Sequence, residues 1–357
     1  MEAKIINTNI EDYGISPFTE TTTPSDLIQG RITAVHRERY EVVCQHGELG
    51  ARLKSGIYYS EAANERFPTV GDYVLLQYNP GGDSLIVQTG ERRSSFSRSD
   101  YSGHGVGFVK NILEQMVAAN FDYVFIMASL NYDFNMKRIE RYLTMAWQSG
   151  AQPVIVLTKS DLSDQVIQQV QQVREIAVGA DVFAISSKTG DGLDELNSYL
   201  QPRKTIVFLG SSGVGKSSLV NALAGEGIMK VADIREDDSK GRHTTTHRQL
   251  TLLNNGVMII DTPGMRELGL WDADSGISET FSDVEALFHQ CKFSDCKHER
   301  EPGCAVRQSI ESDTLSGDRW QRYLQLKKEN LFVTNKTAYL REKDKWHKLT
   351  VINKRKK

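Results

Sequence analysis

The sequence predicts a multidomain protein with a small N-terminal β-barrel, a central α/β domain and a mostly helical C-terminal domain. Short strand-like runs separated by turn residues fill residues 27–88. Apolar strands then alternate with helical patterns over residues 123–260, which is typical of a parallel, doubly wound sheet. After about residue 281 the pattern becomes helical and contains three of the four cysteines.

The composition is that of a globular protein, with 357 residues of which 39% are hydrophobic and 25% charged. Lys and Arg number 43 against 46 Asp and Glu, so the net charge of −3 excludes a uniformly basic nucleic-acid-binding protein. No apolar run approaches the about 18 residues of a membrane span, and the first residues lack the apolar segment of a signal peptide. We therefore expect a cytoplasmic monomer without membrane association.

The N-terminal region predicts a flexible tail over residues 1–26 and a barrel over residues 27–92. Five short β-rich runs in about 65 residues favour an OB-fold, although another small β-domain is the alternative. The polar, basic segment 92–98 is either a solvated linker or a segment that contacts RNA phosphates.

The central domain is expected over residues 93–280. Its strands are predicted from the apolar runs 123–128, 154–157, 182–185, 206–209 and 257–260. Its helices are predicted at 136–147, 165–177, 193–200 and 218–224.

The motif G-x-x-x-x-G-K-S follows one of these strands and precedes a helix, as a phosphate-binding loop does. Glycines let backbone amides close around phosphate oxygens, and the helix N-terminus adds a positive dipole. Lys216 is the expected catalytic cation at the β- and γ-phosphates, and Ser217 an expected Mg²⁺ ligand. A glycine-rich structural turn is the alternative. The residues expected to bind nucleotide here are Gly210, Ser211, Ser212, Gly213, Val214, Gly215, Lys216, Ser217 and Ser218.

Other segments indicate which nucleotide binds. The segment from Thr158 through Lys159 and Ser160 to Asp161 resembles the guanine-binding N/T-K-x-D motif of GTPases. Asp161 would accept two hydrogen bonds from guanine, whereas adenine lacks both donors and would leave the carboxylate unpaired. Thr158 replaces the commoner Asn, and a hydroxyl makes fewer hydrogen bonds than an amide, so base affinity is expected to be lower. Ser186, Ser187 and Lys188 resemble the S-A-K element that supports the base.

The order of these segments predicts a circular permutation. Asp261 and Gly264 form a D-x-x-G motif at the end of a strand, where the Asp would hold Mg²⁺ through water and the Gly amide would face the γ-phosphate. In ordinary GTPases the phosphate loop precedes the base-binding segments, whereas here residues 158–161 and 186–188 come before it.

Cys291, Cys296, His298 and Cys304 lie within one short segment. Three thiolates and one imidazole complete a tetrahedral Zn²⁺ shell, and soft sulfur ligands favour zinc over Mg²⁺ or Ca²⁺. Four protein ligands leave no open position, so we expect one structural Zn²⁺ per chain; buried reduced thiols are the alternative. Cys44 is expected to be a core residue.

Between the phosphate loop and Asp261 lies the run from Gly241 through His243, Thr244 and Thr245 to Thr246. This run, the barrel, the permuted order and the cysteine–histidine segment together resemble the ribosome small subunit-dependent GTPase A (RsgA) family over about residues 27–330. The resemblance implies an OB-fold, a permuted GTPase domain and a zinc domain. It also implies GTP hydrolysis stimulated by the small ribosomal subunit, whose late maturation the protein would assist.

The catalytic polar group is expected in that same run. Ordinary small GTPases place a water-orienting Gln after D-x-x-G, but this position is Met265 here. The resemblance suggests His243 instead, while Thr244 and Thr245 would bind the nucleotide and Thr245 also Mg²⁺. An exposed loop histidine is the alternative for His243, and His247 is a weaker candidate.

The last 38 residues, 320–357, contain twelve Lys or Arg and three Asp or Glu. This excess suits contact with rRNA phosphates, with a solvated helix and frayed tail as the alternative. We therefore expect a GTPase that matures the small ribosomal subunit and binds its rRNA. The alternatives are an RNA-binding scaffold with incidental hydrolysis and a GTPase that acts on a tRNA or protein target.

Overall fold

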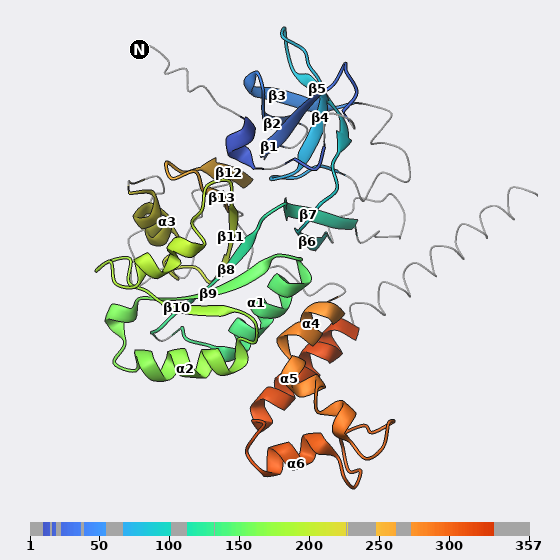
Figure 1. Cartoon of the computed structure of the whole chain (residues 1–357), viewed down its shortest axis with the longest axis vertical. Helices are drawn as coiled ribbons and strands as arrows, with labels where there is room; N and C mark the ends of the chain where they lie inside the picture. Colours follow the sequence, from blue (N-terminus) through green and yellow to red (C-terminus); the bar gives the residue numbers. More distant parts are fainter. Residues whose placement is uncertain are drawn as a thin grey trace, which may run out of the picture.

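The computed structural model describes residues 10–14, 16–18, 23–36, 39–54, 67–100, 113–131, 133–225, 227, 248–261 and 273–331. Figure 1 shows a barrel, an α/β domain and a helical domain following one another along the long axis of the molecule. No helix within the described residues is long and apolar enough to span a membrane.

The N-terminal domain is the predicted five-stranded barrel. Its strands are β1 (Ile28–His36), β2 (Arg39–Cys44), β3 (Gly47–Leu53), β4 (Tyr73–Gln77) and β5 (Ser84–Thr89). The barrel closes in the order β1-β2-β3-β5-β4-β1, in which only the β3–β5 pair is parallel. Ile32, Val42, Cys44, Val74 and Ile86 fill its interior, so Cys44 is a core residue as expected.

The α/β domain contains all five predicted strands, each within about two residues of its expected bounds. They are β8 (Tyr123–Ser129), β9 (Gln152–Thr158), β10 (Asp181–Ala184), β11 (Thr205–Gly210) and β13 (Met258–Asp261). These strands run parallel in the order β10-β9-β8-β11-β13. The helices are α1 (Met136–Gln148), α2 (Val166–Ile176) and α3 (Lys216–Ala224).

Residues 193–200 do not form the predicted α-helix. A 3₁₀ helix, η3 (Leu193–Ser198), occupies this place and buries Leu196, and a second one, η2 (Ser160–Leu162), follows β9. The segment lies between Gly190 and Gly192, which both have positive φ angles, and the turn that leads to β11. Short helical segments of this kind often adopt 3₁₀ geometry.

The barrel and the α/β domain share one continuous eleven-stranded sheet, which the sequence does not predict. The strand β12 (Arg248–Leu252) pairs antiparallel with β13 on one side and with β1 of the barrel on the other. The registers Ala34 with Gln249 and Val35 with Arg248 join the two domains.

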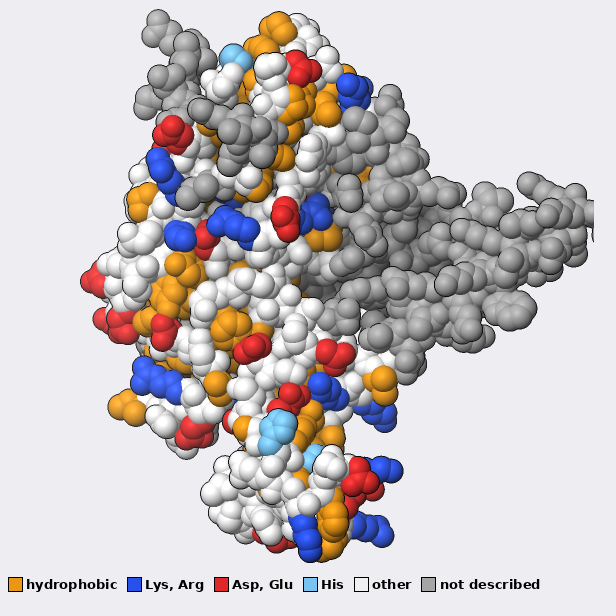
Figure 2. Space-filling view, turned by 45° about the vertical axis from the view of Figure 1, so that its right-hand side comes forward, with side chains coloured by type: hydrophobic (Ala, Val, Ile, Leu, Met, Phe, Trp, Pro, Cys, Tyr) orange, Lys and Arg blue, Asp and Glu red, His pale blue; other side chains and the backbone are white. Residues whose placement is uncertain are grey.

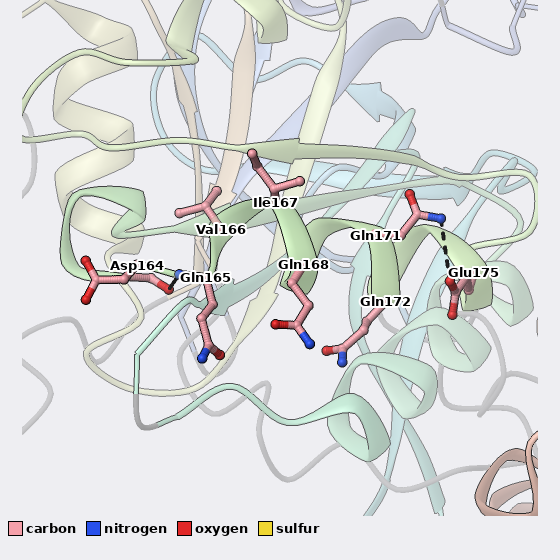
Figure 3. A pocket seen from close by; sticks show the side chains of 9 residues that line it. Asp164, Gln165, Val166, Ile167, Gln168, Gln171, Gln172 and Glu175 are labelled. Atoms are coloured by element: carbon pink, nitrogen blue, oxygen red, sulfur yellow. Dashed lines mark hydrogen bonds between the residues drawn. The ribbon is translucent and has the colours of Figure 1, made fainter.

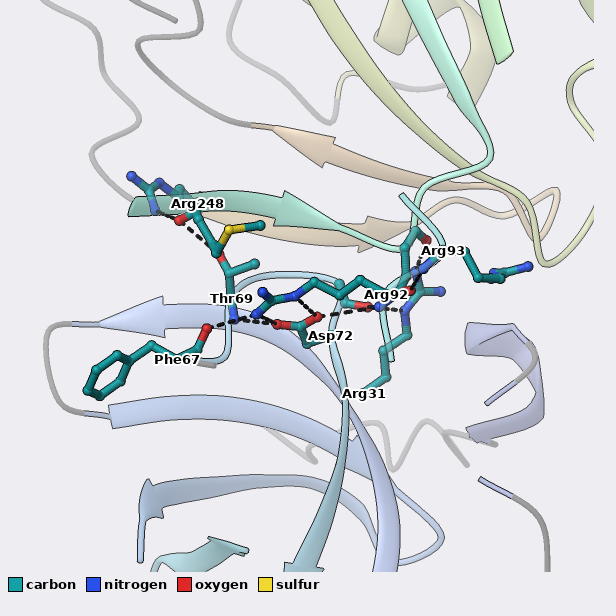
Figure 4. Close-up of polar contacts among 10 residues, drawn as sticks. Arg31, Phe67, Thr69, Asp72, Arg92, Arg93 and Arg248 are labelled. Atoms are coloured by element: carbon teal, nitrogen blue, oxygen red, sulfur yellow. Dashed lines mark hydrogen bonds and ion pairs between the residues drawn. The ribbon is translucent and has the colours of Figure 1, made fainter. Parts of the chain in front are cut away.

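The basic segment 92–98 is not the solvated linker that was one of the two expected alternatives. Its second half begins β6 (Ser95–Asp100), which pairs with β7 (Leu113–Ala119), and Phe96 is buried. Arg92 forms an ion pair of 2.7 Å with the fully buried Asp72 and also donates to the carbonyl of Phe67 (Figure 4). Arg92 therefore neutralises a buried carboxylate, whereas Arg93 is exposed, so contact of this segment with RNA phosphates stays a prediction.

Arg31 of β1 is buried where the two domains meet. It donates to the carbonyls of Tyr13, Gly71 and Asn120 and to the hydroxyl of Thr205. Tyr13 closes the 3₁₀ helix η1 (Ile10–Tyr13) and is itself buried. This part of the N-terminal segment is therefore packed against the protein instead of forming a tail, because the buried guanidinium needs its carbonyl.

The C-terminal domain is helical, as predicted. It contains α5 (Ser282–Glu285), the 3₁₀ helix η5 (Phe288–Gln290), α6 (Ala305–Glu311) and a helix that covers the described residues 317–331, and α4 (Asp274–Thr280) leads into it. Figure 1 shows α4 beside α1 of the α/β domain. The buried Glu140 of α1 pairs with Arg322 and, at 2.9 Å, with Arg319, so a charged cluster fixes the C-terminal helix to the α/β domain.

Candidate nucleotide site and cysteine–histidine cluster

The predicted phosphate loop connects β11 to α3, which begins at Lys216. Gly213 and Gly215 have φ angles of +71° and +103°, in the left-handed region that favours glycine. A Cβ atom at Gly210 would lie 3.0 Å from the carbonyl oxygen of Met127. The strand, loop and helix thus have the arrangement that a phosphate-binding loop requires.

Lys216 Nζ forms an ion pair with Asp261, the last residue of β13. The two residues are 45 positions apart in the sequence but adjacent in space, because β11 and β13 are parallel neighbours. A cation and a carboxylate at the end of neighbouring strands are what binding of a metal–phosphate complex needs. Gly264, the second residue expected from the D-x-x-G motif, lies outside the described residues.

The predicted guanine-binding segment follows β9 and contacts the phosphate loop directly. The Thr158 hydroxyl donates a hydrogen bond of 2.5 Å to the carbonyl of Val214. Lys159 has a φ of +59°, which turns the chain sharply after the strand, and η2 then carries Ser160 and Asp161. Thr158 therefore also contacts the phosphate loop, which its position in the base-binding motif does not predict.

The predicted base-supporting segment follows β10. The Ser186 hydroxyl donates a hydrogen bond of 2.7 Å to the Asp161 carboxylate, and the same oxygen accepts from the amide of Lys188 at 3.3 Å. Ser186 is fully buried, Ser187 is partly buried and Lys188 is exposed. Ser186 thus orients the carboxylate that is expected to bind the base.

These segments all lie at the carboxyl ends of parallel strands, the edge at which open α/β sheets bind ligands. His243, Thr244, Thr245 and Met265 lie outside the described residues. A separate hollow on α2 is lined by Asp164, Gln165, Ile167 and neighbouring side chains, many of them amides (Figure 3). None of the candidate nucleotide-binding residues lines this hollow.

The four predicted metal ligands of the C-terminal domain come together. The ligand atoms of Cys291, Cys296, His298 and Cys304 all lie within 4.8 Å of one another. His298 Nδ1 is 3.5 Å from the sulfur atoms of both Cys291 and Cys304. The His298 ring stacks on Phe288 with ring centroids 4.4 Å apart, which holds the imidazole in place. A cluster of three sulfur atoms and one nitrogen fits one tetrahedral metal ion.

The electrostatics of the cluster also fit a cation. Burial raises the pKa of Cys291, but backbone N–H groups of Ala305 and Val306 and the other two thiols lower it overall. Burial and the thiols of Cys304 and Cys291 raise the pKa of Cys296 to about 11. A bound cation would allow all three thiols to be thiolates. Burial also lowers the pKa of His298, which favours the neutral, ligating imidazole.

Glu301 holds the loop that carries His298. Its carboxylate accepts hydrogen bonds from the backbone amides of Lys297, Glu299 and Arg300 at 3.0–3.1 Å. Hydrogen bonds from its own amide and from these three lower the pKa of Glu301 to about 2. Sequence reasoning missed this residue, because its role depends on a loop conformation that only the fold discloses.

A family model described as RsgA GTPase matches residues 89–271. The chain belongs to the RsgA GTPase family. It is 44% identical over 341 residues to the small ribosomal subunit biogenesis GTPase RsgA 1 of Listeria monocytogenes, and the alignment covers 94% of each chain. It is 41% identical over 310 residues to the small ribosomal subunit biogenesis GTPase RsgA of Methanosarcina acetivorans, covering 87% of this chain and 81% of that one.

Solved structures agree with this assignment. YjeQ from Thermotoga maritima superposes with a TM-score of 0.61 at 25% identity, covering 85% of this chain and 99% of that one. YloQ, described as a circularly permuted GTPase, has a TM-score of 0.57 at 24% identity and shares the fold. Membership of the RsgA GTPase family makes the chain a GTP hydrolase. In the parallel sheet the segments after β9 and β10 come before the phosphate loop after β11, which is the permuted order.

Proposed function

We propose that this RsgA-family GTPase assists the biogenesis of the small ribosomal subunit and hydrolyses GTP at the carboxyl edge of its parallel sheet. The observation that supports the site is the convergence of Lys216, Asp261 and Asp161 from three separate strands on this edge. The relatives from Listeria and Methanosarcina, named as small ribosomal subunit biogenesis GTPases, support the biological role.

In this proposal Asp161 binds the guanine base and Ser186 orients its carboxylate. Backbone amides of the loop 210–217 bind the phosphates, and Lys216 places its charge at the β- and γ-phosphates. Ser217, Thr245 and Asp261 offer the oxygen donors that Mg²⁺ prefers, Asp261 through water. The bound ion would neutralise charge on the phosphates.

Zn²⁺ is our choice for the metal of the cysteine–histidine cluster, because three sulfur donors and one nitrogen donor suit zinc better than harder cations. With four protein ligands the ion would be structural. The domain boundaries at residues 26, 92 and 280 are part of the same proposal.

His243 is proposed as the residue that orients the attacking water, since Met265 cannot do so. His243→Ala should then leave GTP affinity and ribosome affinity intact and lose the stimulated kcat, because the interaction is made only in the transition state. If the variant keeps stimulated kcat and loses only affinity, His243 is a docking residue.

The proposed rRNA contacts are local basic patches. The C-terminal domain exposes Lys292, Lys297, Arg300 and Arg307. Figure 2 shows basic and acidic side chains interspersed over the lower end of the molecule. Within residues 320–331, however, Arg322 pairs with Glu140, and Lys327 lies 3.4 Å from Asp274 and Glu285. Lys328 is exposed, and nine of the twelve Lys and Arg of the basic segment lie beyond residue 331.

The test is multiple-turnover GTP hydrolysis by the full chain with and without purified small ribosomal subunits. Strong stimulation supports the proposal. Binding to the subunit without stimulation would instead indicate a nucleotide-dependent scaffold, and absence of both would indicate a different target.

A further inference from the structure

A chain of polar contacts reaches the phosphate loop from outside the nucleotide-binding motifs. The Ser211 hydroxyl, in the second position of the loop, donates a hydrogen bond to the Asp133 carboxylate. Both oxygens of that carboxylate lie within hydrogen-bond distance of Arg138 Nη1, at 2.8 and 2.7 Å. The contacts therefore run from Arg138 through Asp133 to Ser211.

The start of α1 places these groups. Asn135 is the N-cap of α1, and its side chain accepts a hydrogen bond of 3.1 Å from the amide of Arg138. This cap fixes the first turn of the helix, from which the guanidinium of Arg138 extends back to Asp133. Asp133 itself lies in the connection between β8 and α1, which none of the expected motifs includes.

The charges of the contacting groups favour an ionised Asp133. Partial burial raises the pKa of Asp133, but the hydrogen bonds from Ser211 and Arg138 and the nearby charge of Lys159 lower it overall. An ionised carboxylate beside a site for a triphosphate would repel the ligand if nothing neutralised it. Arg138 supplies that neutralising charge.

A phosphate loop binds best when its amides already point at the phosphates. Gly213 and Gly215 give this loop conformational freedom, which opposes such preorganisation. The hydrogen bond from Ser211 fixes the beginning of the loop, and the Thr158–Val214 hydrogen bond fixes its middle.

We propose that Asp133 is a positioning residue for the phosphate loop, and that Arg138 neutralises Asp133 so that this carboxylate can lie beside a nucleoside triphosphate. The inference rests on the proposed nucleotide site. It adds two residues that act on nucleotide binding through Ser211.

The experiment measures the affinities of the full chain for mant-GTP and mant-GDP, together with KM and kcat for GTP. Ser211→Ala and Asp133→Ala should each weaken both nucleotides by about three- to tenfold, as expected for a partly exposed hydrogen bond to a charged group. KM should rise while kcat stays constant, because the loop binds ground state and transition state alike. The double variant should be no weaker than either single one.

Arg138→Ala separates charge from geometry. The carboxylate of Asp133 would then be uncompensated, so mant-GTP, with its additional negative charge, should lose more affinity than mant-GDP. Adding Asp133→Ala to Arg138→Ala should restore the GTP-to-GDP affinity ratio of the wild type. Asp194→Asn, an exposed carboxylate on η3, is the matched control and should change neither affinity.

The inference would be overturned if the double variant Ser211→Ala, Asp133→Ala lost the sum of the two single losses of nucleotide affinity. It would also be overturned if Ser211→Ala weakened nucleotide binding and Asp133→Ala did not. Unchanged nucleotide affinity of Asp133→Ala, with wild-type protein that binds mant-GTP, would overturn it while leaving the proposed site intact. A wild-type chain that does not bind mant-GTP would refute the proposed site and the inference together. Asp133→Asn, which keeps an acceptor oxygen for Ser211, should retain most of the affinity and serves as the check on folding.

Discussion

The ammonium group of Lys216, the first residue of α3, forms an ion pair with the carboxylate of Asp261, the last residue of β13. In the proposed nucleotide-bound state each has a different partner, the lysine a phosphate oxygen and the carboxylate a metal-bound water. Nucleotide binding thus exchanges one ion pair for two interactions, and neither charge is left uncompensated before or after.

Lys216→Ala should lower GTP affinity and turnover by tenfold or more, because it removes the cation from the β- and γ-phosphates and leaves the Asp261 carboxylate without its partner. Titration with mant-GTP and measurement of phosphate release check this. Lys137→Ala, an exposed lysine on α1, is the control and should match the wild type. Undiminished turnover of Lys216→Ala would contradict the phosphate-loop assignment.

Asp161→Asn should weaken GTP binding and shift base preference toward xanthine nucleotides, whose edge offers an acceptor where guanine offers a donor. Competition of GTP, XTP and ATP for bound mant-GDP measures the preference. Ser186→Ala is the companion variant. It removes the 2.7 Å hydrogen bond to the carboxylate and the bonds that the same oxygen accepts from the amides of Lys188 and Thr189, but it keeps Asp161, so GTP should bind more weakly with its preference over XTP retained. A GTP preference that survives Asp161→Asn would refute the base assignment.

Elemental analysis of the purified chain should find about one zinc per molecule, since four ligand atoms lie within 4.8 Å of one another. Cys296→Ser should lower that content and loosen the C-terminal domain, while nucleotide binding stays largely intact. Cys44→Ala, a cysteine in the barrel core far from the cluster, should keep the metal. Metal-free wild-type protein with a folded C-terminal domain would rule out the site.

Glu140→Ala should destabilise the protein by about 3 kcal/mol, because it removes the buried carboxylate that Arg319 and Arg322 share and leaves Arg319 with that of Asp283 alone. Glu329→Ala removes the carboxylate of the half-exposed Arg141–Glu329 pair, so its expected cost is about 1 kcal/mol or less. Urea denaturation of both full-length variants gives the comparison. Equal losses of stability would show that the Glu140 cluster does not hold the C-terminal helix in place.

The elements that the sequence predicted well are those whose signal is local. Apolar runs marked β8, β9, β11 and β13, and the candidate site residues Asp161, Lys216 and Asp261 were chosen because they lie at or a few residues beyond the ends of such runs. What escaped prediction depends on partners distant in sequence. The contacts of Thr158 with Val214 and of Ser186 with Asp161 depend on how the parallel strands lie beside one another. The ion pair of Arg92 with Asp72 depends in the same way on the fold of the barrel. Trp320 and Tyr323 of the basic C-terminal segment are buried because helix 317–331 packs on Phe281 and on Phe288 of η5.

The pairing of Val35 with Arg248 has a mechanical consequence. Arg248 is the residue at which the chain re-enters the described structure after residues 228–247, the stretch that includes His243. One end of that stretch is thus anchored to a barrel strand, and the other follows α3 and the phosphate loop. A large partner that displaced the barrel would therefore also displace Arg248, because the β1–β12 pairing joins this residue to the barrel. The proposed catalytic segment would move at the end that Arg248 holds.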